Sequence, residues 1–453
     1  MSLRRRAALP AAAVVLAVLA RLLYGRGTIG YDAAWALLWG EQLSEAMVPD
    51  LDASGAPTPH PLAIAASAGV AVVGGGPTVI IAMSWLAFGA LGVVAYALGA
   101  VLYSRWVGAL FAVVLLTRPL LVLEAGQAVI DVPFLALVLG AMVVEVRRPR
   151  TGWAVPALLA AAGLLRPEAW LLAGAWALWA AQVRRDRPAL AAAALAAPLI
   201  WVASDLLATG DPLHSLHGTQ ALAVQLGRPR ELDTALRSTP DYLRYALTEP
   251  VVWIGLAGCA VAATSLYARS VLALAVAGLG LLAFLGLGVT GLPLLSRYLL
   301  LPAALLALWC ALAALVFTVV PGRAFTVGGG VALTVLVATA PALVGRLHGS
   351  VTFIGARATV EQDLNAILTG PGVAPALRRC PLRLPDSAPR PHARRLAPRV
   401  AVGGMDGVTV RYANERARDA YRIGSAPPPG PPPGHTVLAR NASWIASAPP
   451  ARC

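Results

Sequence analysis

The stretch Gly30-Tyr31-Asp32-Ala33-Ala34-Trp35 follows closely on the first long apolar run of the chain, residues 7–24. The chain has only 22 acidic residues and is 58% hydrophobic. A carboxylate at the mouth of an apolar segment is costly near a membrane and needs a specific reason. Asp32 either begins a helix as a capping residue or contributes to a polar site at the membrane surface. We favour the polar site, because further polar residues follow in the same loop.

Composition places the whole chain among polytopic membrane proteins. Its 453 residues have a mean hydropathy of +0.71, and only 13% are charged. The net charge of +14 comes from arginine alone, since the sequence contains no lysine. Short arginine clusters between apolar segments are typical of membrane topology signals and of contact with anionic lipid headgroups. No basic domain with interleaved aromatic residues is present, so the sequence gives no support for nucleic-acid binding.

The N-terminus is predicted to be an uncleaved membrane anchor. Arg4, Arg5 and Arg6 precede the apolar run of residues 7–24, which places this end in the cytoplasm and residues 25–60 outside. The alternative is a cleaved signal peptide, for which Val18-Leu19-Ala20 supplies a small-residue cleavage site. We favour the anchor, and with it a location in the plasma membrane.

Two short helices are expected in the first outer loop. Residues 33–47 place Trp35, Leu38, Trp39, Leu43 and Ala46 on one side at helical spacing, which is typical of a helix lying in the membrane interface. The apolar run 62–73 has about a dozen residues before a glycine-rich turn. It falls short of the roughly 20 residues that cross the hydrocarbon, so we predict a second interfacial or re-entrant helix.

If residues 62–73 do not cross the membrane, every compact arginine cluster falls on the cytoplasmic side and the C-terminus falls outside. The fold is therefore predicted to be an all-α polytopic membrane protein with about eleven transmembrane helices. The predicted spans are residues 7–24, 78–103, 106–123, 132–146, 153–165, 169–183, 188–207, 251–267, 270–289, 298–318 and 324–343.

The predicted domains are a membrane domain, 1–345, and an extracytoplasmic C-terminal region, 346–453, with a proline-rich insert at 427–434. Residues 360–368 allow a helix, and the alternations at 400–402 and 408–410 allow strands, so this region is expected to be α+β. Cys380 and Cys453 lie outside the spans and are predicted to form a disulfide. Cys259 and Cys310 lie within spans and are interpreted as small apolar fillers.

The predicted topology brings the polar residues of several loops to one side of the membrane, where a catalytic site is expected. Structural alternatives exist: Asp131 could cap its span, Arg166 and Glu168 could simply pair, and His214 and His217 could be surface residues. No HExxH, paired CxxC or glycine-rich phosphate loop is present. The residues gathered on this side are Tyr31, Asp32, His60, Glu124, Gln127, Asp131, Arg166, Glu168, His214, His217, Ser296, Arg297 and Tyr298.

The order of these motifs resembles the GT-C membrane glycosyltransferases. A basic N-terminus and one span precede an outer loop with Tyr31-Asp32 and the proline-flanked His60. Two spans later comes Asp131-Val132-Pro133, followed by Leu165-Arg166-Pro167-Glu168-Ala169-Trp170. The resemblance covers about residues 1–300. It is greatest to the branch of the protein O-mannosyltransferases and aminoarabinose lipid A transferases, in its actinobacterial form.

The resemblance implies inverting transfer of a sugar from a polyprenyl-phosphate donor to a cell-envelope glycan, lipid or protein on the outer face. Asp32 matches the first-loop catalytic acid, which would act as general base on the acceptor hydroxyl. Asp131 matches the second-loop acid, which would hold the acceptor or position the first. His60 stands where relatives often carry lysine or arginine near the donor phosphate, and histidine is only partly charged at neutral pH.

Other residues are given supporting roles. Arg118, Arg166 and Arg297 can supply positive charge to the phosphate leaving group, and Arg118 could instead pair with Glu124. A divalent cation held by Asp32, Asp131 or Glu124 suits carboxylate chemistry but is not predicted, and no metal site is assigned. The residues expected at the acceptor or in support are Tyr31, Glu124, Gln127, Glu168 and Tyr298.

Two other classes of function remain open from the sequence. A lipid or solute transporter or flippase would place charges at mid-membrane depth and show inverted repeats. A noncatalytic envelope-assembly protein would use the C-terminal region to bind a partner.

Overall fold

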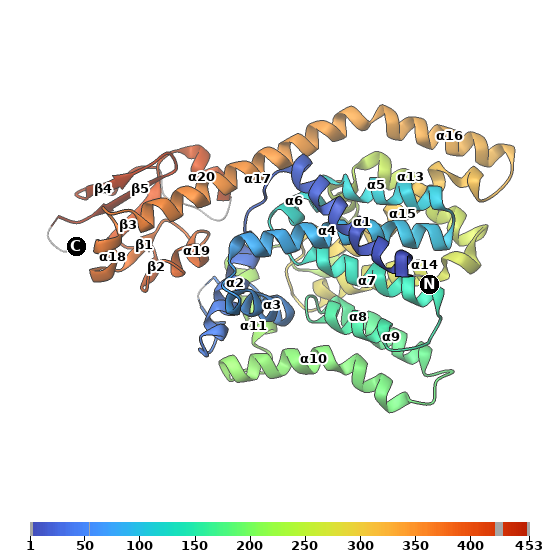
Figure 1. Ribbon diagram of the computed structural model, residues 1–453, viewed down its shortest axis with the longest axis horizontal. Helices are drawn as coiled ribbons and strands as arrows, with labels where there is room; N and C mark the ends of the chain where they lie inside the picture. The colour runs from blue at the N-terminus through green and yellow to red at the C-terminus, as the bar shows by residue number, and fades with distance from the viewer. Residues whose placement is uncertain (1–2, 54, 422–428, 451–453) are drawn as a thin grey trace.

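The computed structural model describes residues 3–53, 55–421 and 429–450. Most of these residues are helical, and a small sheet lies near the C-terminus (Figure 1). The helices are α1 (Leu3–Tyr24), α2 (Tyr31–Ser44), α3 (Pro61–Val72), α4 (Pro77–Leu102), α5 (Arg105–Leu116), α6 (Pro119–Gly126), α7 (Asp131–Arg147), α8 (Ala154–Gly163), α9 (Glu168–Ala180), α10 (Arg187–Thr209), α11 (His214–Gln225), α12 (Leu232–Leu247), α13 (Glu249–Thr264), α14 (Tyr267–Val289), α15 (Leu300–Ala314), α16 (Arg323–Ala338), α17 (Ala340–Thr369), α18 (Ala374–Arg379), α19 (Arg390–Arg394) and α20 (Glu415–Tyr421), with 3-10 turns at Ser296–Leu299 and Val316–Thr318.

Each of the eleven predicted spans coincides with a helix or with a bent pair of helices. Among the described residues, four helices are long and apolar enough to cross a membrane, or up to seven if each bent pair counts as one span. One such pair is α5 and α6, which meet at 64°, where Pro119 begins α6 and cannot continue the preceding helix. The polytopic membrane architecture is confirmed, whereas the count of eleven stays a prediction.

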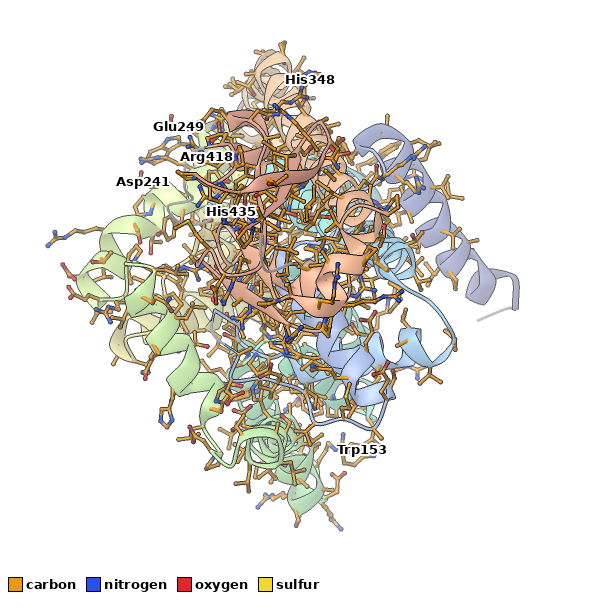
Figure 2. All side chains as sticks on the ribbon, turned by 90° about the vertical axis from the view of Figure 1, so that its left-hand side faces the viewer. Trp153, Asp241, Glu249, His348, Arg418 and His435 are labelled. Carbon is orange, nitrogen blue, oxygen red and sulfur yellow. The ribbon has the colours of Figure 1, made fainter. Side chains whose placement is uncertain are left out.

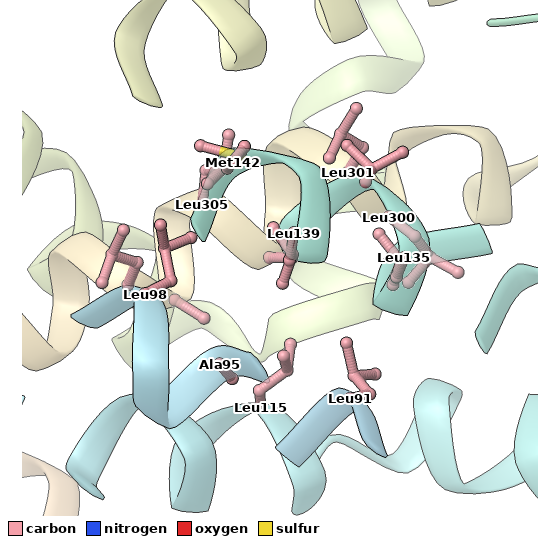
Figure 3. Packing of buried hydrophobic residues seen from close by; sticks show 14 of the residues in the cluster. Leu91, Ala95, Leu98, Leu115, Leu135, Leu139, Met142, Leu300, Leu301 and Leu305 are labelled. Carbon is pink, nitrogen blue, oxygen red and sulfur yellow. The ribbon is translucent and has the colours of Figure 1, made fainter. Parts of the chain in front are cut away.

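The core of the helical bundle is built from α4, α5, α7 and α15. Leucines from all four helices meet there, among them Leu98, Leu115, Leu139 and Leu305 (Figure 3). Gly99 and Gly108 let α4 and α5 approach closely, because a Cβ atom on Gly99 would lie 2.7 Å from the Cα of Gly108. Small residues at a helix contact allow close backbone packing in the absence of a hydrophobic driving force.

The loop between α1 and α4 contains two short helices, as predicted, but the environment of the tryptophans differs from the prediction. Trp35 and Trp39 are fully buried within the protein, where they pack with Leu51 and Ile64. The prediction that they face the membrane interface is wrong, because α3 and the C-terminal region cover this side of α2. Helix α3 has only 12 residues, too few to cross the hydrocarbon.

The C-terminal domain, as we call residues 374–450, is α+β and packs on the end of α17 (Figure 1). Its strands are β1 (Leu382–Leu384), β2 (Val400–Val402), β3 (Val408–Tyr412), β4 (Thr436–Arg440) and β5 (Trp444–Ala448). They form one sheet of order β2-β1-β3-β5-β4, parallel on the β2-β1-β3 side and antiparallel on the other. The strands expected at 400–402 and 408–410 are confirmed.

Helix α17 continues without a break across residue 345, so the predicted boundary there falls inside a helix. Residues 427–428 of the proline-rich insert lie outside the described residues, and so does Cys453, so the Cys380–Cys453 disulfide stays a prediction. Cys259 and Cys310 are free thiols on α13 and α15. Helix α1 begins on the side of the bundle away from the C-terminal domain (Figure 1).

Candidate active site

The backbone before α2 is shaped so that Asp32 projects from the first turn of that helix. Gly25 and Gly27 have positive φ angles of 93° and 81°, which glycine adopts without a steric penalty. The chain then pairs with the end of α6, through hydrogen bonds from Thr28 N to Gly126 O and from Gly30 N to Gln127 O, each 2.7 Å. A carboxylate in the first turn also interacts favourably with the helix dipole.

Asp32 forms an ion pair with Arg297, which precedes α15 in the 3-10 turn Ser296–Leu299. Nη1 of Arg297 donates to Oδ2 of Asp32 at 2.7 Å. Burial on its own would raise the pKa of Asp32, but the charge of Arg297 holds that pKa below its ordinary value. The carboxylate is therefore ionised at neutral pH, as a general base must be.

A second ionic group lies beside the first. Asp131, the first residue of α7, is 1% exposed and pairs with Arg166. Arg166 also donates from Nη2 to Oε1 of Glu168 at 2.7 Å. Its guanidinium carbon stands 4.5 Å from the ring centre of Tyr298, the neighbour of Arg297. The two ionic groups are thereby joined through adjacent residues of one turn.

His60 caps the start of α3 and faces both ionic groups. Its ring packs edge-on against Trp201 at 5.8 Å, and its charge state responds to Asp32, Arg297 and Arg166. Burial lowers the pKa of His60 to about 4, although Asp32 opposes that shift. At neutral pH His60 is consequently uncharged, and it offers hydrogen bonds to a ligand rather than the positive charge expected of a phosphate-binding residue.

Three buried polar atoms of this site have no hydrogen-bond partner within the described structure. They are Nδ1 of His60, Oδ2 of Asp131 and Nε of Arg297. Buried polar atoms in native proteins are nearly always satisfied, so a group of unsatisfied ones calls for an explanation. A polar ligand between these three side chains would supply it.

Of the remaining predicted residues, one lies among the charged groups of the site and two hold the surrounding loop in place. Glu124 is buried and lies within electrostatic range of Arg297, Asp32 and Arg166. Gln127 contributes its backbone carbonyl to the pairing with Gly30 and donates its side chain to Leu123 O at 3.4 Å. The hydroxyl of Tyr31 donates to Gly55 O. Gln127 and Tyr31 thus support the loop in their described contacts.

Among the described residues, Arg118 contacts backbone carbonyls and none of the site residues named above. Its guanidinium donates to Val114 O at 2.7 Å and to Leu247 O at 2.6 Å. These carbonyls border the breaks between α5 and α6 and between α12 and α13, so Arg118 stabilises two bent helix pairs. The predicted pairing with Glu124 is absent from its described contacts, and a role at the phosphate has no support in this geometry. Nε2 of His214 donates to Leu51 O at 3.2 Å, and His217 pairs with Asp211.

The C-terminal domain forms ion pairs with α2, the helix that carries Asp32, and with the loop that follows it. The sequence analysis did not predict this contact. Arg395 pairs with Glu41 at 2.6 Å, and Arg394 pairs with Asp50 at 2.6 Å. The guanidinium carbon of Arg394 also lies 5.8 Å from the ring centre of Trp35. Viewed from its own side, the domain lies over the middle of the bundle (Figure 2). We call the contact of residues 390–395 with α2 and its following loop the clasp.

A second contact reaches the segment before α2, residues 25–30. The hydroxyl of Thr28 donates to Glu361 of α17, and Glu361 also accepts from Nε of Arg357 at 3.2 Å. His392 of α19 lies 3.5 Å from the same carboxylate. All four side chains are buried. The C-terminal domain is therefore fixed on both sides of Asp32 along the chain.

Three carboxylates of the site are engaged by arginine. Asp32 faces Arg297, while Asp131 and Glu168 share Arg166. Within the described ranges, no group of three or more His, Cys, Asp or Glu side chains is arranged to hold a metal ion. A divalent cation requires several oxygen ligands, and with these three carboxylates paired to arginine we derive no step through a metal.

Comparison with known proteins identifies the fold. A crystal structure of ArnT from Cupriavidus metallidurans, bound to undecaprenyl phosphate, matches with a TM-score of 0.57 over 99% of this chain and 98% of that chain. The chain has the ArnT fold. At 12% identity the likeness to ArnT concerns the fold alone. No protein-family model and no curated protein matches the sequence.

ArnT is an aminoarabinose lipid A transferase of the GT-C superfamily. The resemblance to GT-C transferases predicted from the motifs is thus confirmed at the level of fold. The ArnT match also extends over the C-terminal domain, since it covers nearly the full chain. The sequence motifs reached only about residue 300.

Proposed function

We propose that this protein is an inverting membrane glycosyltransferase that moves a sugar from a polyprenyl-phosphate donor to a hydroxyl-bearing acceptor of the cell envelope. The observation that carries the proposal is the Asp32–Arg297 ion pair, set beside unsatisfied polar atoms of His60 and Asp131. An ionised base next to a fixed cation is what this transfer needs. The ArnT fold, known from a complex with undecaprenyl phosphate, supports the donor class.

In the proposed reaction, Asp32 accepts the proton of the acceptor hydroxyl while the acceptor oxygen forms a bond to the anomeric carbon. The bond between that carbon and the phosphate oxygen breaks with its electron pair, and polyprenyl phosphate leaves. Arg297 and Arg166 stabilise the charge that develops on the phosphate. Attack opposite to the leaving group inverts the anomeric configuration.

Asp131 and Glu168 hold Arg166 in place. Uncharged His60 donates a hydrogen bond to the donor or the acceptor. Fixed charges that need no rearrangement during the reaction stabilise a transition state better than water does.

The charge distribution disfavours transport. The ionic groups lie in turns and at helix starts: Asp32 in the first turn of α2, Asp131 at the start of α7 and Arg297 before α15. A transporter site would lie near the bilayer midplane between discontinuous helices. A noncatalytic assembly role would leave the unsatisfied polar atoms of the site without a purpose.

The decisive experiment is a transfer assay in membranes or detergent with a panel of polyprenyl-phosphate sugars. Wild type, Asp32→Asn and Asp131→Asn are compared at matched expression, with Arg440→Gln in the C-terminal domain as control. We expect transfer by wild type and the control, and loss of at least about 100-fold in Asp32→Asn with donor binding retained. Equal activity in all variants, or no consumption of any donor, would refute the proposal.

We also propose the orientation implied by the arginine distribution, with a cytoplasmic N-terminus, eleven spans in the plasma membrane and an extracytoplasmic C-terminal domain. An impermeant thiol reagent applied to intact cells would label a cysteine introduced at Arg440, but not one introduced at Arg185. The reverse labelling pattern would refute this orientation. The proposed Cys380–Cys453 disulfide is tested by peptide mass analysis with and without reduction.

A further inference from the structure

A pocket lies at the opposite end of the bundle from Asp32. It has a volume of about 610 Å³ and opens between α4, α7, α9 and α14. Glu145 lines it near the end of α7, whereas Asp131 begins that helix at the candidate active site. Fourteen residues of helix separate the two by about 20 Å. The pocket is therefore distinct from the site described above.

Six of the eleven lining residues have aliphatic side chains that an acyl chain could contact. The apolar side chains come from Val101, Leu102, Val146, Ala268, Val271 and Leu272. The volume lies in the range of about 300–1,000 Å³ that is usual for sites of small molecules. The aliphatic side chains of this lining, at the surface of a membrane protein, are suited to contact with an acyl chain.

Most polar groups at the pocket already have hydrogen-bond partners among the described residues, whereas Arg269 does not. Glu145 accepts from Trp176 Nε1 and from Arg150 N, each at 2.6 Å, and the hydroxyls of Tyr103 and Ser270 bond at 2.8 Å. Arg269 is exposed, and its guanidinium makes no hydrogen bond or ion pair in the described part of the chain. The pocket thus presents one unpaired cation to a ligand.

The surroundings of Arg269 have the composition of a lipid headgroup layer. Exposed aromatic side chains stack with arginines: Trp106 with Arg105 at 4.8 Å, and Trp179 with Arg150 at 5.0 Å. Aromatic residues with arginines mark the membrane–water interface, and basic pockets between helices bind anionic headgroups. The arginines at this end outnumber Glu145 and Asp186; they are Arg105, Arg147, Arg148, Arg150, Arg184, Arg185, Arg187 and Arg269.

We propose that this pocket binds an anionic glycerophospholipid, with an acyl chain among the aliphatic side chains and the phosphate at Arg269. The excess of arginine favours a headgroup with net negative charge over a zwitterionic one. A lipid in this place would join α4, α7, α9 and α14 and stabilise their packing. The proposal concerns the opposite end of the bundle and is independent of any sugar transfer.

The test uses the full chain in detergent, with phosphatidylglycerol and phosphatidylcholine of identical acyl chains as probes. Native mass spectrometry counts bound lipid, and thermal unfolding measures the stabilisation it gives. We expect wild type to retain phosphatidylglycerol preferentially, and Arg269→Gln to bind it about fivefold more weakly, the factor that corresponds to one headgroup-layer arginine. Arg440→Gln, which removes the same charge from the C-terminal domain, is expected to bind like wild type.

A pocket-filling variant, Leu272→Trp, separates the pocket from the surrounding arginine surface. We expect Leu272→Trp to lose the bound lipid while Arg269 remains in place. Equal retention of both lipids by wild type, or unchanged binding by Arg269→Gln, would overturn the proposal. Loss of lipid in Arg269→Gln but full retention in Leu272→Trp would overturn it as well, because the lipid would then lie on the surface and outside the pocket.

Discussion

Arg297 donates a hydrogen bond of 2.7 Å to Asp32 across 265 residues of sequence. The pair joins the start of α2 to the turn before α15, two elements that meet at the same end of the bundle. Tyr298, the neighbour of Arg297, contacts Arg166, and Arg166 pairs with Asp131. One ionic network thus links loops that are far apart in sequence and gives Asp32 its charge state.

The first prediction concerns Arg297. Replacing it with glutamine removes the cation that lowers the pKa of Asp32 and leaves the opposing effect of burial. We expect the transfer rate to fall by about 100-fold, and the acidic limb of the pH–rate profile to move to higher pH, because Asp32 then loses its charge sooner as the pH drops. Arg237→Gln, at an exposed ion pair on α12, should leave both quantities unchanged. If the acidic limb did not shift in Arg297→Gln, Arg297 would not control the pKa of Asp32.

The second prediction concerns His60 and stability. Its pKa in the folded protein, about 4, lies below the ordinary value of 6.5. Between these values the unfolded chain binds the proton and the folded protein does not, so stability falls as the pH drops from 6.5 towards 4. We expect His60→Asn to show a smaller loss of thermal stability between about pH 7.5 and about pH 5 than wild type.

The exposed His348 provides the control for this measurement, since it lies at the periphery of the molecule (Figure 2). His348→Asn should follow the wild-type dependence on pH. If His60→Asn and His348→Asn gave the same curve as wild type, the neutral state assigned to His60 would be wrong.

The sequence predicted Asp32, Asp131, Arg166 and Arg297 because charged side chains in an apolar chain are few and the arginine clusters establish which loops share a side. These residues do meet in the structure. The same reasoning failed for Trp35, because an apolar helix face has the same pattern whether lipid or protein covers it.

Long-range contacts account for the rest of what the sequence did not show. Arg395 and Glu41 are 354 residues apart, and an arginine in a proline-rich segment carries no signal of its partner. Arg118 was predicted to reach the phosphate, but it bonds to carbonyls at two helix breaks. The break at Thr248, whose φ is 78°, depends on tertiary packing, so no local pattern could have predicted the partner of Arg118.

The third prediction concerns Gly30. A Cβ atom there would lie 2.7 Å from Gln127 O, so Gly30→Ala must separate the segment before α2 from the end of α6. We expect transfer to fall by about tenfold or more, since small misplacements of a catalytic group have large effects. Gly69→Ala on α3 has open space around its Cβ, and alanine favours helix. That variant should keep full activity, and a similar loss in both would argue against the pairing as the cause.

The fourth prediction concerns metal removal. Asp32, Asp131 and Glu168 are engaged by Arg297 and Arg166. We expect transfer to change by less than about twofold after treatment with EDTA, because arginine supplies the charge that a metal would otherwise provide. Loss of activity in EDTA that is restored by one divalent cation would refute this prediction and assign a metal to the site.

The fifth prediction concerns the clasp, in which Arg395 donates to both oxygens of Glu41 at 2.6 to 3.0 Å. Arg395→Glu places a second negative charge beside Glu41, which lies on the helix that carries Asp32. We expect transfer to fall by about fivefold to tenfold, and the double variant Arg395→Glu with Glu41→Arg to recover most of it, because paired reversal restores the attraction.

Arg383→Glu reverses a charge that pairs with Asp406 inside the C-terminal domain, so it tests whether any damage to that domain has the same effect. We expect that variant to retain the wild-type rate. Recovery in the Glu41–Arg395 double variant, together with an inert Arg383→Glu, means that the contact itself positions α2. Failure of the double variant to recover, with the protein still folded, would show instead that the domain influences Asp32 by another route, such as the buried contact between Thr28 and Glu361.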